Sequence, residues 1–351
     1  MRKQRGISLV ELMVSITIGL ILMTGVVQLF LSSRATFTTQ QAISRVQETG
    51  RLAMEFIAQD IRMAGYMGCM SRNLSFESTL ASSAPAYDFG VAIEGRDNFS
   101  GAVAGYPTAK AGTDMLVVRS ANGDSVGVVD NNNSGQLFAA HTGEVADGCG
   151  EDEDSISGLC QGDILVVSDC RRALVFQATN LTPTAGDASV NVVHSNGGTD
   201  SPGNDLSSWG GNSPTATDPF GTDSEIIKIN TVFYYVADNA QGTPTLYQKV
   251  GAAAAQPLLE GVENMQLTFG RDTNADNVPE TYSDASAISA AAWSDVMSVR
   301  VQLLVASTDD NVLSESQAYT FNGDTVDADD VGDRRLRQVF VNTVGIRSRL
   351  P

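Results

Sequence analysis

The 351-residue sequence is poor in the residue types on which many functional sites depend. It has only two histidines and no Cys-x-x-Cys pair, which argues against a structural zinc site or a histidine-based catalytic centre. Basic residues are also scarce, with 22 against 41 acidic residues, and the formal net charge is −19. Since phosphate binding needs a basic surface, this balance argues against nucleic acid as a partner.

Catalytic sequence motifs are missing as well. The sequence contains no Gly-x-Ser-x-Gly, no P-loop and no His-Glu-x-x-His, and no Gly-x-Gly-x-x-Gly stands where a strand would lead into a helix. Residues 73–351 hold 37 acidic residues, so no pair of carboxylates stands out as an acid and a base. We therefore expect the protein not to be an enzyme.

Two further absences mark the N-terminal part. No charged residue occurs from Leu12 to Ser33, and no proline precedes Pro85. Those 22 uncharged, mostly apolar residues would form a helix about 33 Å long, enough to cross a bilayer. Three of the first five residues are basic, so the positive-inside rule predicts a cytoplasmic N-terminus and export of everything after the span. The alternative is a secretory signal cleaved near Ala35, but such signals have shorter apolar regions of about 7 to 15 residues.

One acidic residue, Glu11, stands at the edge of the apolar run, in the string Gly6-Ile-Ser-Leu-Val-Glu11-Leu-Met-Val. An ionisable group in a membrane span costs about 2.5 to 3.5 kcal/mol and is therefore a functional hypothesis. The string resembles the class III signal of type IV prepilins. This resemblance implies that a prepilin peptidase cleaves after Gly6, that the new N-terminal amine of Ile7 is methylated, and that Glu11 serves in assembly. In that family Phe is commoner than Ile at the first mature position.

The next stretch has the periodicity of an amphipathic helix. Small and apolar residues recur at steps of three and four, namely Ile43, Val46, Gly50, Ala53, Ile57, Ile61 and Ala64. With Gly65 as a stop, the pattern predicts one helix over 7–65, about 88 Å long. A coiled coil is the alternative for its second half.

Four later segments, at 62–69, 162–170, 259–266 and 334–340, resemble the PilW group of minor pilins, whereas 121–160 and 185–225 resemble no family. The expected organisation is a leader peptide (1–6), a transmembrane half of the helix that lies in the filament core (7–33), an amphipathic half (34–66) and an extracytoplasmic globular head (67–351).

Beyond the helix the apolar period changes to two. Alternation is clearest at 226–236 and 296–306, and further strands are expected at 115–119, 164–168, 173–177, 245–250, 262–269 and 316–321. We therefore predict an α+β, pilin-like fold, in which a meandering antiparallel sheet packs one face against the helix stripe. The Gly-, Ser-, Asn-, Asp- and Pro-rich stretch 195–225 is expected to be a long surface excursion.

The four cysteines are exported and even in number, which predicts disulfides. Three pairings are possible. Cys149 and Cys160 flank an acidic loop, which leaves Cys69, at the helix exit, to pair with Cys170; free buried thiols are the alternative.

A calcium site is predicted at Asp272-Thr-Asn274-Ala-Asp276-Asn-Val278-Pro-Glu280. Oxygen ligands at positions one, three and five, a backbone carbonyl at seven and a carboxylate at nine resemble the first part of an EF-hand loop. Asn277 replaces the usual glycine, and no glutamate stands at position twelve, which is Ser283, so Glu280 or Asp284 would complete the site. The alternative is an Asp/Asn-rich turn between two strands.

Two basic clusters stand out in the acidic head, Arg171 with Arg172 and Arg334 with Arg335 and Arg337. They are interpreted as subunit contacts, with local salt bridges as the alternative.

The resemblance implies a minor pilin of a type IV pilus, which joins other minor pilins in an initiation complex at the tip, primes assembly of the major pilin and supports adhesion, with a tip adhesin as a further partner. Such a protein spans the bacterial inner membrane before assembly and belongs to an extracellular pilus afterwards. Two alternatives remain open: a minor pseudopilin of a type II secretion system, and a membrane-anchored calcium-dependent adhesin or extracytoplasmic enzyme.

Overall fold

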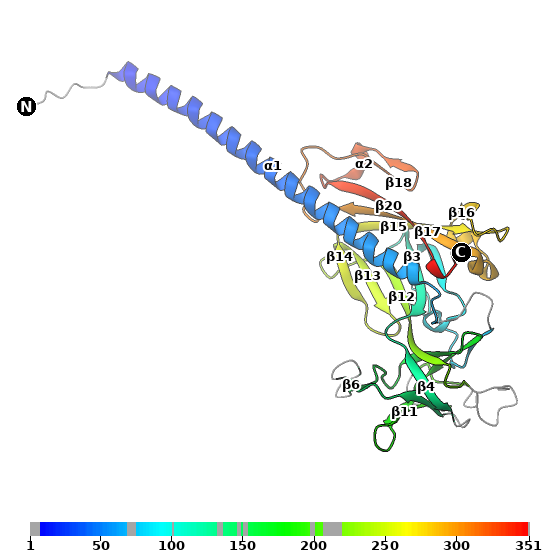
Figure 1. The fold of residues 1–351 in the computed structure, drawn as a ribbon. Helices are drawn as coiled ribbons and strands as arrows, with labels where there is room; N and C mark the ends of the chain where they lie inside the picture. Colours follow the sequence, from blue (N-terminus) through cyan, green and yellow to red (C-terminus); the bar gives the residue numbers. More distant parts are fainter. Residues whose placement is uncertain are drawn as a thin grey trace, which may run out of the picture.

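A long helix followed by a β-rich head makes up the computed structural model of the protein (Figure 1). The structure describes residues 8–68, 75–99, 102–131, 136–145, 149, 154–196, 201–205 and 220–349. The helix α1 spans Leu9–Met63, and its first half projects away from the head. The predicted α+β, pilin-like class is confirmed.

The second half of α1 packs on the head through small and branched residues. Its buried residues are Ala42, Val46, Gly50, Ala53, Ile57, Ala58 and Ile61. The predicted stripe is therefore correct except at its start, where Ile43 is 37% exposed and the neighbouring Ala42 is buried. The smaller side chain lets the helix approach the sheet closely, and Gly50 does the same further along, because a Cβ there would overlap the ring of Phe340. The helix ends before Gly65, whose φ of +72° favours glycine.

The head has two lobes. The helix-proximal lobe contains β2 (Ile93–Phe99), β3 (Thr113–Ala121), β13 (Pro244–Val250), β14 (Gln256–Glu260) and a four-stranded sheet in the order β16 (Thr281–Ser283), β15 (Val262–Arg271), β17 (Val296–Ala306) and β20 (Arg337–Gly345). Between β17 and β20 lie β18 (Tyr319–Phe321), β19 (Asp324–Val326) and the short helix α2 (Ala328–Val331). The 3-10 turns are η1 (Pro85–Tyr87), η2 (Ala285–Ala287), η3 (Ala290–Asp295) and η4 (Arg347–Arg349).

The distal lobe lies beyond the end of α1, at the far end of the head (Figure 1). It contains β1 (Ser75–Ser78), β4 (Val126–Asn131), β5 (Gln136–Ala140), β8 (Ile164–Ser168), β9 (Arg172–Gln177), β10 (Asn180–Pro183) and β11 (Ser189–Val193), with the small hairpin of β6 (Glu144–Val145) and β7 (Ser155–Ile156). Its hydrophobic core, built from residues between Val126 and Ile226, shares no member with the core under α1.

One long strand, β12 (Glu225–Asp238), joins the lobes. Its first residues pair with β8 and β4 in the distal lobe, and its later residues pair with β3 and β13 in the proximal lobe. Because Ile229 faces Ala121 in register, the distal lobe is inserted between two neighbouring antiparallel strands, β3 and β12.

The predicted single meander is therefore wrong. Strands β1 and β9 pair in parallel. Within the described ranges, only the proximal lobe packs on the helix, and β18 pairs only with β19. In the predicted excursion 195–225, residues 206–219 lie outside the described part, but Asn204 is buried and bonds to Gln177 of β9.

Candidate functional site

Glu11 lies in the first turn of α1 and is exposed. Its backbone N–H donates to the Ser8 Oγ at 3.2 Å, so Ser8 caps the helix. A carboxylate at this position is favourable because the helix N-terminus carries a partial positive charge. Sequence reasoning missed the cap, although Ser followed three residues later by Glu is a capping-box signal. The predicted cleavage and methylation residues, Gly6 and Ile7, lie outside the described residues.

None of the described residues of the head covers the apolar half of α1. Every large apolar side chain from Leu9 to Leu31 is 44 to 74% exposed. The helix contains an apolar window with a mean hydropathy of 2.2 that is long enough to cross a membrane, and none of that window is buried. An apolar surface of this size requires lipid or other apolar helices around it. The structure thus has the form of a head anchored by its N-terminal helix.

The predicted calcium residues lie together in the loop between β15 and β16. The carboxylates of Asp272, Asp276 and Glu280 each offer an oxygen atom, and these atoms lie within 4.8 Å of one another. Asn277 has a φ of +68°, the left-handed conformation expected where an EF-hand loop has glycine. Asn274 lies in the same loop, and its Oδ1 accepts the backbone N–H of Asp276.

The loop is organised around Asp272. Its Oδ1 accepts the N–H of Ala275 at 2.7 Å, and its Oδ2 accepts the N–H of Asn277 at 2.9 Å. Asp276 accepts the N–H of Val278, whose side chain is exposed. These bonds also fit the alternative of an Asp/Asn-rich turn, because side-chain acceptors of this kind stabilise turns without an ion. The acidic cluster is therefore able to bind a metal, while its chemistry alone does not select calcium.

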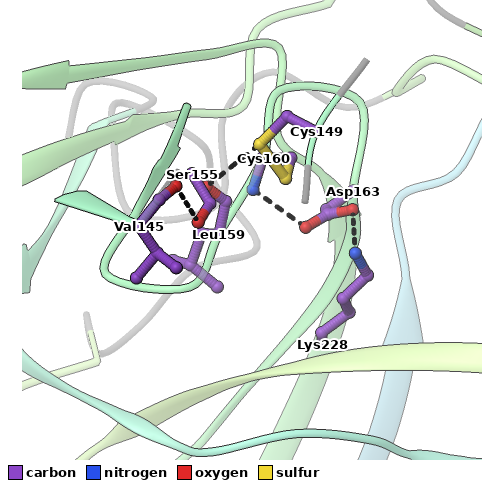
Figure 2. The surroundings of a disulfide bond; sticks show 7 residues. All are labelled: Val145, Cys149, Ser155, Leu159, Cys160, Asp163 and Lys228. Atoms are coloured by element: carbon purple, nitrogen blue, oxygen red, sulfur yellow. Dashed lines mark hydrogen bonds and ion pairs between the residues drawn. A yellow bond between two sulfur atoms is a disulfide. The ribbon is translucent and has the colours of Figure 1, made fainter. Parts of the chain in front are cut away.

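The cysteines stabilise the distal lobe. Cys149 and Cys160 form a disulfide with a Cα–Cα distance of 5.3 Å (Figure 2). Asp163 accepts the N–H of Cys160 through Oδ2 and pairs with the Lys228 Nζ through Oδ1 at 2.6 Å, which links this end of the lobe to β12. Cys170 is also in a disulfide, and Cys69, its predicted partner, lies outside the described residues.

Two arginines of the basic clusters form ion pairs within the head. Arg337 is 8% exposed and forms ion pairs with Glu263 at 2.7 Å and Asp333 at 2.7 Å, and these carboxylates raise its pKa. Arg172 pairs with Asp169 at 3.1 Å. At these two residues the structure supports the alternative of local salt bridges, because each guanidinium is already paired within the head.

Comparison with known proteins supports the features at both ends of the chain. Residues 1–27 match the model of the prokaryotic N-terminal methylation motif, and residues 233–348 match the family model described as type IV pilus-assembly protein W. The second match begins inside β12 and runs to η4, so it covers much of the proximal lobe and leaves out the distal strands β4 to β11.

No curated protein matches the sequence significantly. Among solved structures, a type IV-like pilin from Thermus thermophilus aligns with 88% of this chain and 98% of its own, at 11% identity and a TM-score of 0.33. The exposed apolar helix, the β-rich head and the two family matches agree with one another, and together they support a PilW-like type IV pilin.

Proposed function

We propose that this pilin is a minor pilin that joins other minor pilins in a small complex, primes assembly of a type IV pilus and remains at its tip. The observation that carries the proposal is a PilW-type proximal lobe on a helix whose first half is apolar and entirely uncovered. Before assembly, residues 7–33 lie in the inner membrane with the N-terminus in the cytoplasm. Afterwards they lie in the filament core, while residues 34–66 support the head, residues 67–351.

Processing precedes assembly in this proposal. The peptidase removes residues 1–6 by cleaving between Gly6 and Ile7, and the amine of Ile7 is then methylated. The match to the N-terminal methylation motif supports this step. The intact mass of the purified protein should lack the leader and include one methyl group, whereas an unprocessed Met1 or a terminus near Ala35 would contradict the proposal.

Type IV pilins are structural rather than enzymatic proteins, and we infer no reaction for this chain. Its partners are the prepilin peptidase, the major pilin and other minor pilins, together with a tip adhesin if the complex supports attachment. A chromosomal deletion complemented by the full-length gene distinguishes this function from that of a pseudopilin. Loss of surface pili with normal protein secretion is expected. Normal piliation with a secretion defect would instead favour the type II secretion system.

We also propose that the loop at 272–280 binds calcium. The ligands would be Asp272, Asn274, Asp276, the carbonyl of Val278, and Glu280; hard oxygen donors of this kind suit a hard cation. The clustering of three carboxylates within 4.8 Å supports the site, since their mutual repulsion is relieved by a divalent ion. The missing position-twelve glutamate makes the binding weak.

Millimolar calcium should raise the melting temperature of the protein. Asp272→Ala combined with Asp276→Ala should abolish the increase, while Asp329→Ala, at an exposed acidic residue on α2, should retain it. Absence of a calcium response in both calorimetry and thermal melts would favour the simple turn.

A further inference from the structure

The head approaches the apolar half of α1 at the segment between β17 and β20 (Figure 1). Residues 311–314 and Arg334 lie beside residues 31–40 of the helix, and together they line an open hollow of about 720 Å³. The Thr39 Oγ1 donates to the carbonyl of Val312 at 3.0 Å, which fixes this segment on the helix. We call this space the collar hollow.

The depth of the collar hollow follows from helix geometry. If the hydrocarbon core begins at Leu12, next to Glu11, a thickness of about 30 Å at 1.5 Å per residue ends near Leu31. Arg34 is three residues further on, about 4.5 Å beyond the hydrocarbon edge. The hollow therefore lies at the depth of the lipid headgroups on the exported side.

The lining of the collar hollow is positively charged, although the head as a whole is acidic. It contains two cationic side chains, Arg34 and Arg334, and no carboxylate, although residues 73–351 hold 37 acidic residues against 14 basic ones. Several hydroxyl groups and the amide of Asn311 add hydrogen-bonding capacity, and Leu31 and Leu313 supply apolar surface.

Neither arginine is neutralised by a carboxylate in the part of the chain that the structure describes. The Arg34 guanidinium has no hydrogen bond or ion pair there, and the Arg334 guanidinium donates to the uncharged oxygens of Asn311 and Ser314.

Four acidic residues flank the hollow in sequence, and none forms an ion pair with Arg34 or Arg334 among the described residues. Glu315, next to Ser314, is exposed, and the other three have partners. Asp309 pairs with Arg45 at 3.8 Å, and Asp333 pairs with Arg337. Asp310 is oriented towards the backbone, accepting the N–H groups of Arg334 and Asn311, and these bonds lower its pKa. Arg34 and Arg334, with the apolar side chain of Leu31 beside them, therefore lie at the depth of the lipid headgroups.

We propose that the collar hollow binds the phosphodiester headgroup of an anionic phospholipid in the exported leaflet. Arg34 and Arg334 hold the phosphate, to which guanidinium groups are well matched, and Leu31 contacts the adjoining acyl carbons. This site rests on the membrane-anchored state of the proposed function. Binding positions the head on the membrane before assembly, and the lipid must leave when the subunit enters a filament.

The test uses the full chain in nanodiscs of phosphatidylcholine with one third phosphatidylglycerol, and native mass spectrometry to identify the lipids retained on release. The wild-type chain should retain phosphatidylglycerol in preference to phosphatidylcholine. Arg34→Gln and Arg334→Gln should each lower the ratio of retained phosphatidylglycerol to retained phosphatidylcholine roughly fivefold. One arginine near an anionic lipid surface contributes about that factor in binding. Arg51→Gln, at an exposed arginine of α1 outside the hollow, should leave the ratio unchanged.

Three results would overturn the site. The first is equal retention of phosphatidylglycerol by wild type and Arg34→Gln. The Arg34 side chain has no partner among the described residues, so its loss should not disturb their fold. Displacement of phosphatidylglycerol by millimolar inorganic phosphate would show that a free anion suffices. Proteolysis within residues 9–33 in intact nanodiscs would show that the helix is not inserted, which would contradict the membrane anchor as well, whereas the first two results leave the anchor standing.

Discussion

At the scale of single residues, Glu11 is the charged side chain that lies at the edge of the apolar segment, where a charge is unfavourable without a partner. Its carboxylate lies in the exposed first turn of α1, and the large apolar side chains around it are exposed as well. In a filament core its carboxylate would require a cation, and the amine of Ile7 in a neighbouring subunit supplies one. An unpaired charge in that setting costs about 2.5 to 3.5 kcal/mol.

Glu11→Ala should therefore leave leader cleavage intact and lower incorporation into pili at least tenfold, because the free amine of the neighbour loses its counter-ion. Immunoblots of sheared pili against whole cells measure the ratio. Glu55→Ala, at an exposed glutamate in the amphipathic half, is the matched control and should assemble normally. Wild-type incorporation of Glu11→Ala would show that the charge is incidental.

Asp114 is a second residue with a testable consequence. It is 2% exposed, and its carboxylate accepts the N–H groups of Asn98 and Leu267, both at 2.8 Å. Burial raises its pKa to about 6, more than these two hydrogen bonds lower it, and Asp97 adds to the increase. A raised carboxyl pKa stabilises the fold fully below pH 4, and this contribution is lost as the pH rises through 6.

The free energy of unfolding should therefore fall between pH 4 and pH 7 by an Asp114 contribution on the order of 3 kcal/mol. Asp114→Asn cannot ionise and should flatten that part of the pH profile, measured by denaturant unfolding of the detergent-solubilised chain. Asp124→Asn, at an exposed position, should retain the wild-type slope. Parallel profiles for Asp114→Asn and wild type would contradict the assignment.

At the scale of elements, the contact between α1 and β20 depends on a missing side chain. A Cβ at Gly50 would overlap the ring of Phe340, whereas a Cβ at Gly25 meets nothing within 4 Å. Alanine improves helix propensity by about 1 kcal/mol at either position, but at Gly50 the overlap forces the helix away from the sheet. Gly50→Ala should therefore destabilise the head by about 1 to 2 kcal/mol.

Gly25→Ala is the matched control and should cause no loss in the same denaturant titration. Phe340→Leu should recover part of the stability lost in Gly50→Ala, since a smaller side chain leaves room for the new methyl group. Additive effects of the two substitutions would show that the contact does not limit the packing.

The same elements show what the sequence can and cannot predict. Local periodicity predicted the helix and eight of the twenty described strands, but it missed β4, β5, β11 and β20 among others. The positive φ of Asn277 follows from its place in the Asp272 loop. The burial of Ala42 in place of Ile43 does not, because it depends on how closely α1 approaches the sheet. The pairing of Ile229 with Ala121 also escaped prediction, because strand register between residues 108 positions apart leaves no local signal.

At the scale of the whole molecule, the two lobes have separate hydrophobic cores, so we expect them to unfold locally with different free energies. The distal core contains only residues from Val126 to Ile226, and the core under α1 contains none of them. The lobes share β12 and a smaller cluster that includes Met67, Val166 and Ile229. Regions with separate cores open with different free energies, so a change confined to one core should stay there.

The Cys149–Cys160 disulfide provides that change, because it closes a loop wholly inside the distal lobe. Cys149→Ser with Cys160→Ser should cost about 3 kcal/mol in the chain-entropy view of a short loop. Hydrogen exchange on the full chain should then show lower protection in β4, β5, β8 and β11, with β15, β17 and the second half of α1 unchanged. Equal loss of protection in β15 and β17 would mean that β12 couples the lobes into one cooperative unit, and that the distal lobe is not a separate module on the part of the head that matches the family.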